Sequence, residues 1–146
     1  MEKLKIAVIG TGLVGSFHAE AFYRNPQCEL IAVCDIEESK VKEISSKFQC
    51  KYYTDFQSLI NNETLDAISI ATPEQTRYEP AILSANKNLK ILLEKPLGRN
   101  IEDIKNLINK LKNYQQLISV NFILHEEPRY KLMKEKIKNN EIGNIV

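Results

Sequence analysis

Short apolar runs alternate with amphipathic stretches along the whole chain. The apolar runs are continuous and rich in Ile, Leu and Val, which is typical of parallel strands buried on both faces. We predict strands at Lys5–Ile9, Leu30–Cys34, Lys51–Tyr53, Ala67–Ala71, Ile91–Leu93 and Leu117–Val120. The stretches between them have helical spacing, and we predict helices at Leu13–Arg24, Ser39–Phe48, Phe56–Ile60, Arg77–Ala85, Ile101–Lys112 and Pro128–Asn139.

The helix predicted at Ile101–Lys112 shows this spacing most clearly, because its apolar residues form one stripe that a core would cover. Regular alternation of strands and helices predicts an α/β fold in which helices cover both faces of a doubly wound parallel sheet. The expected strand order is 3-2-1-4-5-6, and ligands bind such sheets at the carboxyl ends of the strands.

Composition and charge narrow the class of protein. The chain has 146 residues, enough for one domain with a sizeable core. Its 20 basic and 19 acidic residues nearly cancel, so we expect no nucleic-acid partner. No apolar stretch approaches the length of a membrane span and no signal-peptide region is recognisable, so we expect no membrane partner. The three cysteines have no metal-ligand spacing and are odd in number, which predicts no metal site and fits a reducing cytoplasm.

A glycine-rich turn, Gly10-Thr-Gly12-Leu-Val-Gly15, follows the first predicted strand and leads into the first helix. Strand, turn and helix in this order are what a dinucleotide site requires, whereas the glycines alone are weak evidence. Gly10 permits a tight turn, Gly12 lets the backbone approach a pyrophosphate, and Gly15 allows close packing of helix on strand. The amides and the positive dipole end of the helix then face the phosphates.

An acidic residue, Asp35, ends the second predicted strand, 20 positions after Gly15. A carboxylate at this distance accepts hydrogen bonds from the adenosine ribose hydroxyls in dinucleotide-binding folds. The simpler alternative is that Asp35 caps the helix that follows. The two roles are compatible.

The fourth and fifth predicted strands also end in residues that can carry chemistry. The fourth runs into Thr72 and Pro73, and Pro73 stops the strand because it lacks a backbone donor. The fifth runs into Glu94, Lys95 and Pro96, which place an acid and an amine directly after a buried strand. The Lys95–Pro96 bond can be cis, since the penalty is small before proline. Each pattern also fits a plain turn after a buried strand.

These segments together resemble the N-terminal half of the Gfo/Idh/MocA oxidoreductases, a family that includes glucose–fructose oxidoreductase and inositol dehydrogenase. The matching segments are Gly10-Thr-Gly12-Leu-Val-Gly15-Ser-Phe-His18, Val33-Cys34-Asp35, Ala71-Thr72-Pro73, Glu94-Lys95-Pro96-Leu97, Pro128-Arg-Tyr130 and Glu141-Ile-Gly143-Asn-Ile145. They span nearly the whole chain in the order and spacing of the family. The resemblance implies a Rossmann-type domain that binds NAD(P).

The resemblance also assigns roles to individual residues. Thr11, Leu13 and Val14 lie in the turn that binds the pyrophosphate, Asp35 binds the adenosine ribose, and Thr72 and Pro73 border the nicotinamide. Lys95 is the catalytic residue of the motif, near the nicotinamide ribose and the substrate hydroxyl, and Glu94 positions cofactor or lysine. NADP is the less expected cofactor, because its 2′-phosphate meets the like charge of Asp35 and Ile36 offers no cation.

Three positions carry no clear assignment. His18 matches the family's histidine, and it either contacts the cleft or simply packs against the sheet. Arg77 stands where many relatives have a histidine, and His125 lies near where many have an arginine.

The resemblance further implies a second α+β domain, absent from these residues, that supplies most substrate contacts. We therefore expect a dinucleotide-binding domain at 1–125 and, at 126–146, a helix and the first strand of the missing domain. The parent protein is expected to be a homo-oligomeric dehydrogenase of a sugar, inositol or related polyol. The alternative is a stand-alone, non-catalytic module that binds or senses NAD(H).

Overall fold

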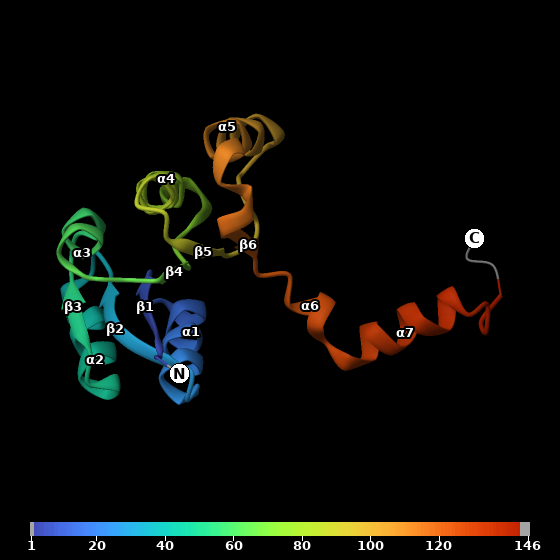
Figure 1. Ribbon diagram of the computed structural model, residues 1–146, viewed down its shortest axis with the longest axis horizontal. Coiled ribbons are helices and arrows are strands. Elements are labelled where there is room, and N and C mark those ends of the chain that lie inside the picture. Colours follow the sequence, from blue (N-terminus) through green and yellow to red (C-terminus); the bar gives the residue numbers. More distant parts are fainter. Residues whose placement is uncertain (1, 144–146) are drawn as a thin grey trace.

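The computed structural model describes residues 2–143 and contains a parallel sheet in the predicted order, β3-β2-β1-β4-β5-β6 (Figure 1). The strands are β1 (Leu4–Ile9), β2 (Cys28–Cys34), β3 (Lys51–Tyr53), β4 (Ala67–Ile70), β5 (Lys90–Leu93) and β6 (Ile118–Val120). β2 begins two residues before the predicted Leu30, because Cys28 continues its inward-facing positions while Glu29 faces solvent. Ala71 lies just past β4 instead of within it.

Helices cover both faces of the sheet (Figure 1). They are α1 (Leu13–Arg24), α2 (Glu38–Phe48), α3 (Phe56–Asn62), α4 (Tyr78–Asn86) and α5 (Ile101–Leu111), and two short 3-10 helices lie at η1 (Glu74–Thr76) and η2 (Lys112–Leu117). α1 and α2 close one core around Val8, Val33, Val41 and Phe48. α3, α4 and α5 close the other, larger core, in which Leu107 and Leu111 of the predicted stripe are buried.

Local sequence explains several helix boundaries. The carboxylate of Asp55 accepts a hydrogen bond from the Ser58 amide and caps α3, and the side chain of Asn100 caps α5 through the Asp103 amide. Past α4 the chain turns at Asn88, whose φ of 57° is left-handed and suits asparagine. Each predicted helix is present, and its ends differ from the predicted ends by at most two residues.

The chain continues past β6 as two further helices, α6 (Ile123–Glu126) and α7 (Pro128–Lys138), which lead away from the sheet (Figure 1). Pro128 is the first residue of α7, and Glu127 caps the helix through the amides of Arg129 and Tyr130. We call residues 122–138 the C-terminal arm. The strand predicted for a second domain is not seen at Glu141 and Ile142, which lie in a turn, and 144–146 lie outside the described residues.

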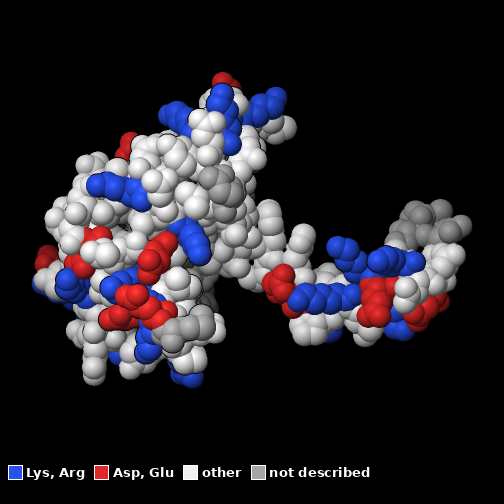
Figure 2. Space-filling model, in the orientation of Figure 1, with Lys and Arg blue, Asp and Glu red and all other residues white. Residues whose placement is uncertain are grey.

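On the face shown in Figure 2, acidic and basic side chains are interspersed over the sheet domain and the arm. This mixture fits the balanced charge of the sequence. Within residues 2–143, no helix is long and apolar enough to cross a membrane.

Candidate functional site

The residue that follows each strand lies on one edge of the sheet. Ile9, Cys34, Ile70, Leu93 and Val120 occupy one row of the register across five neighbouring strands. The next residues, Gly10, Asp35, Ala71, Glu94 and Asn121, each extend the ladder by one backbone hydrogen bond of 2.8–3.1 Å. Segments far apart in sequence thus meet at the carboxyl edge, where the fold predicts ligands.

A side chain would meet different surroundings at each of the three glycines of the turn. Gly10 has φ +89°, and a Cβ there would lie 2.8 Å from the backbone carbon of Ala71. A Cβ on Gly15 would lie 1.7 Å from the Gly10 carbonyl oxygen, so helix and turn could not approach as they do. A Cβ on Gly12 would meet no atom within 4 Å, so nothing within the domain accounts for a glycine there. Open space above Gly12 is the place that a pyrophosphate requires.

The first turn of α1 faces the same space. Its N-cap is Gly12, which offers no side chain to satisfy the first amides, and the first turn contains no acidic residue. Leu13 and Val14 are exposed there. A helix start of this kind favours an anionic ligand through its amides and its dipole.

Asp35 holds the glycine turn from the neighbouring strand. Its Oδ2 accepts hydrogen bonds from the Thr11 amide at 2.7 Å and from the Thr11 hydroxyl at 3.0 Å. Its Oδ1 accepts one from the Glu37 amide at 3.0 Å and keeps a second lone pair. The N-cap of α2 is Glu37, so Asp35 is not itself the cap. Because the Thr11 amide is bound by Asp35, a contact between that amide and a phosphate stays a prediction.

A cleft of about 1280 Å³ runs along this edge. Nine predicted site residues line it: Gly10, Gly12, Leu13, Val14, Asp35, Thr72, Pro73, Glu94 and Lys95. The buried Thr11 and Gly15 are not among its lining residues. The wall also contains residues that the sequence did not single out, among them Ile36, Asp55, Phe56 and Tyr78. Among residues 2–143 no group of three or more His, Cys, Asp and Glu side chains could hold a metal ion.

Glu94 is buried at the centre of a hydrogen-bonded network. Its Oε1 lies 3.1 Å from His18 Nε2 and accepts a hydrogen bond of 2.5 Å from the side-chain amide of Asn121. Its Oε2 accepts a hydrogen bond of 3.1 Å from the backbone amide of Lys95. On the other side of the imidazole, His18 Nδ1 lies 2.7 Å from the hydroxyl of the fully buried Ser69. These contacts hold the carboxylate of Glu94 next to the backbone of Lys95.

Ser69 and Asn121 were missed by the sequence interpretation. Asn121 directly follows a predicted strand, as Glu94 does, so its place in the alternation was a usable signal. Ser69 lies within a buried strand, and its polar side chain among Ile residues was the only hint. The ring of His18 contacts Ser69 of β4 and Glu94, and His18 is not among the residues that line the cleft, so its contact with the cleft stays a prediction.

Arg77 is a buried residue of the cleft wall. Its guanidinium donates to the backbone carbonyls of Thr72, Glu94 and Pro96. Burial lowers the pKa of Arg77, while the negative charges of Glu74 and Glu94 act in the opposite direction. Three buried polar atoms have no hydrogen-bond partner among the described residues: Arg77 Nε, Thr72 Oγ1 and the Tyr78 hydroxyl.

Lys95 is exposed beside Pro73 and Glu94 in the cleft wall. The Lys95–Pro96 peptide bond is cis, the form that the sequence allowed. The structure therefore brings together the four segments identified in sequence: the glycine turn, Asp35, Thr72–Pro73 and Glu94–Lys95.

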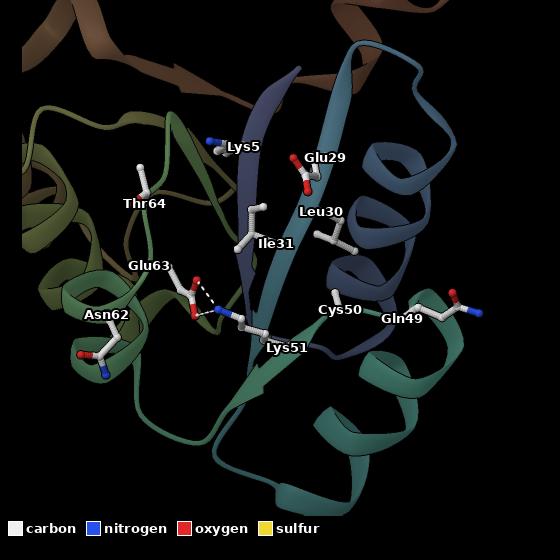
Figure 3. Close-up of a pocket in the computed structure, with 10 residues that line it drawn as sticks. All are labelled: Lys5, Glu29, Leu30, Ile31, Gln49, Cys50, Lys51, Asn62, Glu63 and Thr64. Atoms are coloured by element: carbon white, nitrogen blue, oxygen red, sulfur yellow. Dashed lines mark hydrogen bonds and ion pairs between the residues drawn. The ribbon is translucent and has the colours of Figure 1, made fainter. Parts of the chain in front are cut away.

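A second hollow, of about 780 Å³, lies at the amino ends of β1, β2 and β3 (Figure 3). Its walls contain Lys5, Glu29, Lys51 and Glu63. Lys51 Nζ reaches both oxygens of Glu63, at 2.9 and 3.0 Å, so these two charges neutralise each other. None of the predicted site residues lines this hollow.

Comparison with known proteins agrees with this geometry. Residues 4–122 match the family described as an oxidoreductase family with an NAD-binding Rossmann fold. The chain belongs to that family, the Gfo/Idh/MocA oxidoreductases, as its motifs predicted. Its cofactor class is therefore NAD, carried by a Rossmann domain.

Individual relatives carry more specific names. The chain is 29% identical to the myo-inositol 2-dehydrogenase of Thermotoga maritima, over 96% of this chain and 42% of that protein. It superposes with a TM-score of 0.93 on myo-inositol 2-dehydrogenase from Lactobacillus plantarum, at 25% identity, covering 99% of this chain and 44% of that one. Myo-inositol dehydrogenase from Lactobacillus casei, solved with NAD(H) and myo-inositol, gives a TM-score of 0.88 at 26% identity, covering 97% and 43%. The chain thus spans less than half the length of these relatives.

Proposed function

We propose that this chain is the NAD-binding half of a dehydrogenase that acts on a hydroxyl of inositol, a related polyol or a sugar. The main support for the proposal is the cleft at one edge of the sheet. Its wall contains residues of the glycine turn, Asp35, Thr72–Pro73 and Lys95. The names of the relatives, which are inositol dehydrogenases, support the substrate class.

The adenosine end of NAD is assigned to the glycine turn and Asp35. The open space at Gly12 and the uncapped start of α1 fit a pyrophosphate. Asp35 Oδ1 has capacity to accept a ribose hydroxyl, and this carboxylate disfavours a 2′-phosphate. The nearby cation of Lys40 is engaged by Glu37 at 2.6 Å, so it offers little compensation for a second phosphate. NAD is therefore the proposed cofactor in preference to NADP.

The nicotinamide end is assigned to Thr72, Pro73 and Lys95. The buried Thr72 hydroxyl lacks a partner among the described residues, and a polar group bound in the cleft would relieve a cost of about 1–3 kcal/mol. When bound, NAD⁺ supplies the hydride acceptor. Lys95 orients a substrate hydroxyl and stabilises the charge that develops as its proton leaves, while Glu94 holds the lysine backbone.

Calorimetry and an activity assay test this function. We expect NADH to bind more tightly than NADPH, and equal or tighter binding of NADPH would contradict the role of Asp35. We expect no measurable oxidation of myo-inositol, scyllo-inositol or glucose with NAD⁺, because the relatives are more than twice as long as this chain. Turnover by the pure 146-residue chain would show that its site is more complete than we propose.

The alternative, a non-catalytic module that binds or senses NAD(H), is favoured by the exposure of Lys95. A catalytic lysine in a dehydrogenase is expected to lie in a site closed to water. The reading frame after Val146 distinguishes the two functions. A continuation that encodes an Asp-x-x-x-His segment would exclude the module.

We also propose that the working form is a cytoplasmic homo-oligomer. Large apolar side chains of the C-terminal arm are exposed, including Phe122, Leu124, Leu132 and Met133, and such surfaces favour association. The free cysteines Cys28, Cys34 and Cys50 fit a reducing compartment. Light scattering that shows only a monomer would contradict the association.

A further inference from the structure

Arg77 is a charged residue in an unusually buried place. It lies between η1 and α4, and only 3% of its surface is exposed. Removing a guanidinium from water is costly unless its donors are satisfied. Its two terminal nitrogens donate to three backbone carbonyl oxygens, which do not neutralise its charge, and its Nε has no hydrogen-bond partner among the described residues.

The three carbonyls belong to two segments. Nη2 donates to Thr72 at 2.5 Å, in the segment after β4, while Nη1 donates to Glu94 and Pro96, in the segment after β5. The β4–β5 ladder runs as far as the bond from the Glu94 amide to the Ile70 carbonyl, 3.1 Å long. Past that bond, the guanidinium connects the two segments.

We propose that Arg77 is a positioning residue for the nicotinamide end of the cleft. By holding the carbonyls of Thr72, Glu94 and Pro96, it sets the distance between the Thr72–Pro73 wall and Lys95. The inference rests on the proposed function, because it takes these segments to face the nicotinamide. It adds a buried residue of the wall that acts through the backbone carbonyls it holds.

The chemistry of the side chain explains why arginine does this. Its planar fork presents several donors at fixed angles, so it can hold carbonyls of two segments in one geometry. A lysine ammonium would keep the charge but lose that fork. A glutamine would keep a donor but lose the charge.

The test compares two ligands, NADH and ADP, which keeps the adenosine and the pyrophosphate but lacks the nicotinamide and its ribose. Their dissociation constants are measured by calorimetry for the wild type, Arg77→Lys and Arg77→Gln. We expect both variants to bind NADH about tenfold more weakly, the equivalent of one charge-assisted hydrogen bond. ADP should bind to the variants within a factor of about two of its affinity for the wild type, since the glycine turn and Asp35 are unchanged. Arg99→Lys is the matched control, because Arg99 is exposed and pairs with Asp103.

The outcomes separate the two proposals. If the wild type binds neither ligand, the proposed function fails. If it binds both, and the variants weaken both equally or neither, Arg77 does not position the nicotinamide end. Weakening of both ligands by Arg77→Gln alone would indicate long-range charge attraction and would also overturn the inference.

A measurement on the wild type covers variants that fail to fold. The NMR signals of the Arg77 guanidinium should shift on addition of NADH and stay in place with ADP. Equal shifts with both ligands would count against a role confined to the nicotinamide end.

Discussion

The two edges of the sheet place their polar groups differently. At the amino ends of β1, β2 and β3, Lys51 and Glu63 satisfy each other's charge (Figure 3). Glu63 also accepts a hydrogen bond of 2.5 Å from the Tyr53 hydroxyl. At the carboxyl edge, side chains hold backbone: Asp35 binds the Thr11 amide, Glu94 the Lys95 amide, and Arg77 three carbonyls. In the hollow at the amino ends, the main charged pair satisfies itself, whereas at the carboxyl edge side chains hold the backbone of the cleft wall.

This difference separates residues that stabilise the fold from residues that prepare a site. Pairs such as Lys51–Glu63 join neighbouring elements and satisfy themselves. The carboxyl-edge residues hold turns whose remaining groups stay available to a ligand. Substitutions at the two edges should therefore have separable effects on stability and on NADH affinity.

The largest expected effects come from two glycines of the same turn. Gly15→Ala places its Cβ 1.7 Å from the Gly10 oxygen and should destabilise the domain by about 3 kcal/mol or more. Gly12→Ala meets no atom within 4 Å and should leave the melting temperature unchanged while NADH binding falls at least about tenfold. Thermal melts and calorimetry on both variants measure this. If Gly12→Ala and the wild type bound NADH equally well, the assignment of the pyrophosphate to this turn would be wrong.

Asp35→Asn should have the next largest effect, on cofactor choice. Losing the carboxylate removes about 1.5–3 kcal/mol of charged hydrogen bonding to the ribose and relieves repulsion of a 2′-phosphate. We expect NADH affinity to fall by about tenfold or more, and the preference for NADH over NADPH to shrink. The nearby Glu38→Gln, on the exposed side of α2, is the control. An unchanged ratio of the two affinities would contradict the assignment of Asp35.

Asn121→Ala tests the network beneath Lys95. The change removes the amide that donates to Glu94 and leaves part of a buried carboxylate unsatisfied, at a cost of about 1–3 kcal/mol. We expect the free energy of unfolding to fall by this amount and NADH to bind more weakly. ADP binding should be retained. A loss of stability with full NADH affinity would make Asn121 purely structural.

Glu63→Gln should have the smallest effect and should act on stability alone. Burial raises the pKa of Glu63, but the bonds from Tyr53 and Lys51 outweigh burial and lower it. Its contribution is thus present above the unfolded pKa of roughly 4.3 and is lost as the pH falls through the folded value. We expect a loss of about 1 kcal/mol at neutral pH that shrinks in acid, with NADH binding unchanged. Weaker NADH binding by this variant would show that the two edges are coupled.

Much of the fold could be predicted because its signals are local. Continuous apolar runs mark buried parallel strands, and the glycine turn, Asp35 and the strand ends follow from the topology. The 3-10 helices and α6 were missed because they are too short for a periodic pattern. Strand β2 was predicted too short because the exposed Glu29 interrupts its apolar run.

The parts of the site that escaped prediction depend on distant partners. Arg77 was noted only as a departure from relatives, since nothing nearby in sequence shows that its guanidinium reaches residues 94 and 96. The role of the Ser69 hydroxyl follows from its contact with His18, which lies 51 positions away in the sequence. Side-chain contacts of this kind follow from the assembled sheet and are not visible in a one-dimensional pattern.

The contact between His18 and Asn121 joins residues 103 positions apart. Both side chains hold Glu94, so the Lys95 segment reaches its final arrangement only after β6 has joined the sheet. During synthesis the glycine turn and Asp35 emerge from the ribosome first, while Asn121, the last member of the network, emerges 86 residues after Asp35. A nascent chain should thus be able to form its adenosine end well before its nicotinamide end.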